Sequence, residues 1–96
     1  MKITLDNVRP SNHSTIKGNF DVLFPEIGMK IKECRLVKNR NGEFFIGWPS
    51  YKKDDSWIQT VYMDSEVDGK ENAVHADLVD LATKAILDKE REQKAV

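Results

Sequence analysis

The residues best suited to bind a ligand gather in one short segment, where aromatic and basic side chains surround a proline. Trp48, Tyr51 and Trp57 lie within ten residues of each other, and Lys52 and Lys53 stand between them. Lysine side chains neutralise phosphates, and exposed aromatic rings stack on unpaired bases. The segment therefore has the residue types of a nucleic-acid contact, with Tyr51 as the best candidate for an exposed ring.

Each of these residue types also has a structural explanation. Trp48 continues an apolar strand face, so we expect it in the core or in an interface, and the same alternative applies to Trp57. Lysines on an edge strand prevent sheet-to-sheet aggregation, and from charge alone this is the more general explanation. Arg40 is a further candidate cation in the preceding turn, whereas Arg35 is assigned to a structural cation–π pair with Trp48.

The sequence contains no constellation typical of an enzyme. His13 stands in a polar turn and His75 near the start of a helix, and neither lies in a motif. Cys34 is the only cysteine, so an internal disulfide and a cysteine zinc cluster are excluded, and we expect it to be a small buried side chain. The acidic segment 64–72 lacks the calcium-loop pattern. We predict a protein without catalysis, cofactor, metal or small-molecule substrate.

Length and composition favour one small soluble domain spanning residues 1–96. A chain this short buries only roughly 60–65% of its unfolded surface, so a homodimer is a reasonable expectation. With 40% hydrophobic and 32% charged residues, the chain is typical of globular proteins. It has no apolar run of roughly 20 residues and no signal-peptide core near its start, which favours a cytoplasmic protein without membrane contact.

Charge is distributed unevenly along the chain. Residues 1–53 contain ten Lys/Arg and five Asp/Glu, whereas residues 54–96 contain five Lys/Arg and eleven Asp/Glu. Such asymmetry can produce a basic face on a protein whose net charge is only −1. It can equally be trivial, because charge along a sequence does not map simply onto a surface.

Five segments carry the alternation of strands: 2–9, 15–24, 29–38, 44–48 and 56–63. Between the third and fourth, Asn41-Gly42 predicts a two-residue hairpin turn. That turn would pair Val37 with Ile46, Arg35 with Trp48, and Leu36 with Gly47. Pro49 cannot donate to a ladder, so pairing should stop there.

Both faces of this predicted hairpin are apolar. One face would carry Ile31, Val37, Phe44, Ile46 and Trp48. The other would carry Cys34, Leu36, Phe45 and Gly47. We therefore expect the chain's own helix to cover one face and a second subunit to cover the other.

A helix is predicted from Ala73 onward, with Asn72 as its N-cap. Its apolar stripe consists of Val74, Leu78, Leu81, Ala82, Ala85 and Ile86. The tail from about residue 91 to residue 96 lacks the stripe and is expected to fray. The predicted fold class is α+β: an antiparallel sheet of about five strands followed by one C-terminal amphipathic helix, forming a strand-mediated homodimer.

Four segments resemble the stage V sporulation protein G family: NVR (7–9), CRLVKNRNG (34–42), FFIGWPSYK (44–52) and DDSWIQTVY (54–62). The resemblance covers roughly residues 2–90. It implies a small α+β domain that dimerises through its strands and binds nucleic acid as a non-catalytic regulator. It also implies DNA contact just after Pro-Ser, where this chain has Tyr51, Lys52 and Lys53. Tyr51 stands where the family commonly has a basic residue.

Two functions follow as hypotheses. The first is a cytoplasmic homodimer that binds DNA, or else RNA, as a regulator through the nucleic-acid-binding residues Lys52, Lys53, Tyr51 and Arg40. The alternative is a protein-interaction module without nucleic-acid binding, which would use an exposed sheet edge and the acidic helix. Retention on a heparin or DNA column distinguishes them, since only the first should bind tightly.

Overall fold

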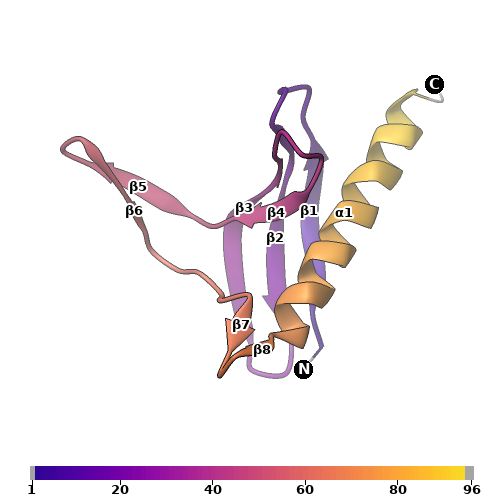
Figure 1. Cartoon of the computed structure of the whole chain (residues 1–96). Coiled ribbons are helices and arrows are strands. Elements are labelled where there is room, and N and C mark those ends of the chain that lie inside the picture. The colour runs from indigo at the N-terminus through magenta and orange to yellow at the C-terminus, as the bar shows by residue number, and fades with distance from the viewer. Residues whose placement is uncertain (1, 95–96) are drawn as a thin grey trace.

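The computed structural model describes residues 2–94. Its body is an antiparallel sheet with the strand order β1-β2-β3-β4 and a C-terminal helix across one face (Figure 1). The elements of this body are β1 (Thr4–Pro10), β2 (Ile16–Phe24), β3 (Met29–Lys38), β4 (Phe44–Gly47) and α1 (Ala73–Lys94). The α+β prediction is confirmed, but the main sheet has four strands rather than five.

Two small hairpins lie between β4 and α1, each forming a sheet of its own. They consist of β5 (Ser50–Lys53) with β6 (Ser56–Gln59), and β7 (Glu66–Val67) with β8 (Lys70–Glu71). The first hairpin, hereafter the ribbon, projects from the body as an arm (Figure 1). The segment between the fourth and fifth predicted strands therefore forms a hairpin with the start of the predicted strand 56–63, which ends at Gln59. The two strands of this hairpin are joined by a two-residue turn at Asp54-Asp55.

The hydrophobic core lies between α1 and the side of the sheet that faces it. Leu78, Ala82 and Ile86 recur every four residues on one helix face and are fully buried. The strands contribute the buried side chains of Phe20, Val22, Phe24, Ile31, Cys34, Leu36 and Ile46. Leu81, which we expected in the helix stripe, is 38% exposed and lies outside this core.

The helix begins as the sequence predicts. The side-chain oxygen of Asn72 accepts hydrogen bonds from the backbone N–H groups of Val74 (3.1 Å) and His75 (3.4 Å), which is N-capping. α1 then continues to Lys94, so the stretch from residue 91, where we expected fraying, is helical to that point. Residues 95 and 96 lie outside the described part of the chain.

The predicted turn between β3 and β4 is wrong by one residue. The backbone N–H of Asn39 donates to the carbonyl of Glu43 at 2.9 Å, which closes a three-residue loop. The Asn39 side chain accepts from the N–H groups of Asn41 and Glu43 at 2.9 Å each. Within the loop only Gly42 has a positive φ, of 82°, whereas the two-residue turn needs two such residues.

Compared with the predicted pairing, the observed pairing of β3 with β4 is shifted by one residue, and this shift exchanges the two faces of the hairpin. Val37 lies opposite Phe45, Leu36 opposite Ile46, and Arg35 opposite Gly47. Leu36 and Ile46 therefore point toward α1, while Val37 and Phe45 point away from it. Phe45 is 45% exposed, so within one chain β4 is buried on one face only.

A glycine of β2, Gly18, sets the distance between helix and sheet. Gly47, which the predicted register placed opposite Leu36, lies on the face away from α1. Gly18 pairs with Leu36 instead, and a Cβ there would overlap the side chain of Ile86 and lie 2.8 Å from the backbone oxygen of Arg9. Gly18 therefore allows α1 to pack closely on β2.

Candidate nucleic-acid interface

The ribbon positions the two candidate lysines. In its ladder Lys52 lies opposite Trp57, and Tyr51 lies opposite Ile58. Because neighbouring residues of a strand point to opposite faces, Lys52 shares a face with Trp57, whereas Tyr51 and Lys53 lie on the other. Both lysines are exposed, and within residues 2–94 neither forms an ion pair.

The tip of the ribbon carries both basic and acidic side chains. Asp54 and Asp55 form the turn directly after the lysines, so the four residues at the tip carry no formal net charge. Asp54 has a φ of 56°, a conformation that Asp and Asn tolerate better than most residues. At the base, the backbone N–H of Thr60 donates to the carbonyl of Pro49 at 3.1 Å and closes the hairpin.

Arg40 lies apart from the lysines within one chain. It is an exposed residue of the β3–β4 turn, and β4 runs from that turn to the base of the ribbon (Figure 1). Arg40 and the tip of the ribbon are thus at opposite ends of this run.

Trp48 and Arg35 do not form the expected cation–π pair. Trp48 is 5% exposed and packs in the core, in agreement with its structural explanation. Arg35 instead lies across Gly47, because a Cβ at that glycine would be 3.2 Å from the guanidinium Nε. The cation–π contact that forms is between Lys38 and the ring of Phe44, at 5.5 Å.

The residue that sequence reasoning undervalued is Trp57. It is 70% exposed, more than Tyr51 at 48%. Trp57 lines a groove of about 800 Å³ whose floor includes Arg35, Val37 and Phe45. This outer groove lies between the ribbon and the outer face of the sheet, meaning the side turned away from α1. The sequence contains one signal for this position: Lys52 and Trp57 are equally distant from Asp54-Asp55, so a two-residue turn there would pair them across a hairpin.

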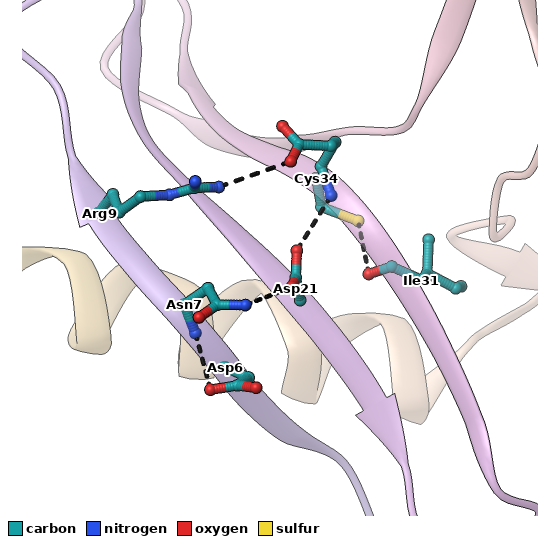
Figure 2. Close-up of polar contacts among 7 residues, drawn as sticks. Asp6, Asn7, Arg9, Asp21, Ile31 and Cys34 are labelled. Carbon is teal, nitrogen blue, oxygen red and sulfur yellow. Dashed lines mark hydrogen bonds and ion pairs between the residues drawn. The ribbon is translucent and has the colours of Figure 1, made fainter.

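The other half of the outer face is closed by a polar cluster around Asp21 (Figure 2). Asp21 is only 3% exposed. Its carboxylate accepts hydrogen bonds from the Asn7 side chain at 2.7 Å and from the backbone N–H of Glu33 at 3.1 Å. The Asn7 hydrogen bond is the main cause that lowers the pKa of Asp21, so the buried carboxyl stays ionised.

This cluster coincides with irregularities in both neighbouring strands. The register shifts between Asp6 and Arg9 in β1, and the ladder between β2 and β3 shifts beside Asp21. Asn7 and Glu33, its two donors, have φ values of 51° and 64°. Above them Arg9 and Glu33 form an exposed ion pair at 3.8 Å. Asp21 is therefore a structural residue that holds two bulges in place.

The remaining candidates for chemistry have structural roles. Cys34 is fully buried, and burial raises the pKa of its thiol to about 12, so it is protonated at neutral pH. His13 Nδ1 accepts hydrogen bonds from the backbone N–H groups of Thr15 and Ile16 in the β1–β2 turn.

In the described part of the chain no three His, Cys, Asp or Glu residues are grouped to hold a metal. No helix there combines the length and apolar character needed to cross a bilayer.

The search for relatives returned none. No family model, no curated protein and no solved structure matches this chain. The resemblance to the stage V sporulation protein G family therefore stays an expectation. The functional argument rests on the exposed residues and the groove described above.

Proposed function

We propose that this chain is a non-catalytic regulator that binds DNA, or else RNA, as a cytoplasmic homodimer of the stage V sporulation protein G type. The observation that carries the proposal is the ribbon, which projects from the body and presents Lys52 and Lys53 near its tip (Figure 1). A two-stranded β-ribbon is one of the two elements that fit the major groove of B-DNA. The sequence resemblance assigns DNA contact to the same positions.

The binding would be mainly electrostatic. Each lysine that neutralises a phosphate releases condensed counterions, which favours binding and makes it weaken with added salt. Asp54 and Asp55 oppose this attraction, so a single ribbon tip binds weakly. A dimer displays the tip twice, and Arg40 of each copy adds a further cation at a separate position.

The exposed apolar side chains of the ribbon support the homodimer. Tyr51 is 48% and Ile58 is 37% exposed, and the two lie opposite each other on one face of the ribbon. Large apolar groups that share an exposed face usually become buried in an interface. We therefore assign Tyr51, which the sequence suggested as a base-stacking ring, to contact with a second copy together with Ile58, related by a two-fold axis. Lys53 lies two residues further along the same face, at the tip of the ribbon, and stays outside this contact.

Charge reversal at the tip tests the proposal. The double variant Lys52→Glu/Lys53→Glu should lose at least about tenfold in affinity for duplex DNA at low salt, because two attractive charges become repulsive. The matched control is Asp54→Asn/Asp55→Asn, which removes two acids from the same turn and leaves its backbone unstrained, so it should bind more tightly. Gel-shift titrations measure both, and sedimentation equilibrium checks that the dimer persists. Equal binding by the reversed variant and the wild type would refute the site.

The exposed edge of β4 favours one alternative. Within residues 2–94, β4 pairs only with β3, so its other edge is free to add a strand from a partner protein. In that case the acidic helix and the sheet edge would form the interface, and the protein would flow through a heparin column. Late, salt-dependent elution despite a net charge of −1 supports nucleic-acid binding instead.

A further inference from the structure

We propose that the outer groove binds single-stranded nucleic acid, with Trp57 and Phe45 as stacking rings and with Arg35 and Lys32 as phosphate-binding cations. This inference rests on the proposed function, because the same ribbon that presents Lys52 and Lys53 forms one wall of the groove. It adds a site that the lysines at the tip do not provide, and it specifies which form of nucleic acid that site takes.

The groove is continuous with a second hollow. The first, of about 800 Å³, has its floor on β3 and β4 and its wall on the ribbon. The second, of about 420 Å³, extends toward Lys32. Arg35, Ser50 and Trp57 line both hollows, so the two form one channel along the ribbon. A channel of this kind can follow an extended strand past several nucleotides.

Two aromatic rings border the channel from separate elements. Trp57 belongs to β6 and is 70% exposed, and Phe45 belongs to β4 and is 45% exposed. Neither ring contributes to the core cluster. Exposed rings along a groove are platforms on which bases stack without preference for sequence, since every base has a π-face.

The cations of the channel are available to phosphates. Among residues 2–94, Arg35 and Lys32 form no ion pair. Glu33 is the one carboxylate that lines the described channel, and its charge is offset by Arg9 at 3.8 Å. Lys52 lies on the same ribbon face as Trp57, so it continues the positive charge toward the tip.

A single strand fits this surface better than the other occupants. Duplex DNA keeps its bases stacked on each other, so its bases cannot stack on Trp57 or Phe45. A second copy of the chain packed into the channel would have to supply carboxylates to Arg35 and Lys32, because burying either cation unpaired costs several kcal/mol. The part of the outer face near Asp21 is already closed by hydrogen bonds and ion pairs.

The test is a set of fluorescence-anisotropy titrations with labelled oligothymidylate and oligouridylate of about 12 nucleotides, a length within the usual site size, and with a DNA duplex. The variants are Trp57→Ala, Trp57→Phe and, as control, Tyr62→Ala. Tyr62 is a similarly exposed ring, at 62%, that does not line the channel. Loss of one stacking ring should weaken single-strand binding roughly 5- to 150-fold, while Trp57→Phe and Tyr62→Ala stay close to wild type. Comparison of the two oligonucleotides shows whether DNA or RNA is preferred.

The outcomes separate this inference from the proposed function. If the single strands bind equally to wild type and Trp57→Ala, or only duplex binds, the channel proposal is wrong and the proposed function stands. If Trp57→Ala weakens single-strand binding while Lys52→Glu/Lys53→Glu leaves all binding unchanged, the channel is supported and the tip assignment fails. If sedimentation shows that Trp57→Ala turns a dimer into a monomer, the channel belongs to a second copy and the proposal is overturned.

Discussion

At the scale of single residues, Asp21 shows how a polar group can determine the shape of a sheet. It lies in the middle of β2 with almost no exposure, yet it is charged and fully engaged by Asn7 and Glu33 (Figure 2). Buried carboxylates are stable only when such donors replace water. Alternation along segment 15–24 puts Asp21 on the side opposite Phe20 and Val22, but it carries no sign that the partners of Asp21 would lie in bulges.

Substitution Asp21→Asn should destabilise the fold by about 1–3 kcal/mol at neutral pH, because the new amide presents N–H groups where the carboxylate accepted them. Since folding lowers the pKa of Asp21, its stabilising contribution is complete above the unfolded pKa, about 3.9. That contribution is lost as the pH falls through the lower, folded value. The difference between wild type and variant should therefore shrink below about pH 4.

Urea unfolding at a series of pH values measures this difference. The exposed helix residue Asp80 supplies the control, because Asp80→Asn should change the free energy of unfolding by no more than about 0.5 kcal/mol. If the difference in unfolding free energy between wild type and Asp21→Asn stays constant from neutral to acidic pH, the charge of Asp21 does not contribute to stability.

At the scale of elements, the sequence predicted where the helix and most strands begin and end better than it predicted which residues pair between strands. Asn72 and the repeat through Leu78, Ala82 and Ile86 were sufficient to predict the start and the buried face of α1. The β3–β4 register was wrong because Asn39 accepts two backbone hydrogen bonds and lengthens the loop. Asn-Gly signals a turn, but it does not reveal which neighbouring side chain will close it.

The two sheet glycines give a matched test of the observed faces. Gly18→Ala should cost about 1–3 kcal/mol, because its Cβ would meet both Ile86 and the Arg9 backbone and force helix and sheet apart. Gly47→Ala meets only the movable side chains of Arg35 and Val37 on the outer face, so we expect a loss below about 1 kcal/mol. Thermal or urea unfolding of both variants measures the difference. Equal losses would contradict the register described above.

At the scale of the whole molecule, α1 and the channel lie on opposite faces of the sheet. α1, with exposed acids such as Asp77 and Asp80, covers one face of the sheet. Arg35 and Lys32 line the channel on the other face. β6 falls within the predicted strand 56–63, but β5 and its pairing with β6 could not be predicted, because β5 is short and exposed and lacks the half-buried alternation that identifies strands. Residues Ser50–Lys53 have the composition of a loop, and they form β5 because β6 pairs with them.

The central claim is that lysines of the ribbon bind nucleic-acid phosphates. Its most direct test is the salt dependence of DNA binding by wild type and by Lys52→Ala/Lys53→Ala, with the binding constant measured by anisotropy at several salt concentrations. If both lysines contact phosphates, the slope of log K against log salt should be shallower by about two for each bound chain in the variant. An unchanged slope, or binding that does not depend on salt in the wild type, would contradict the claim.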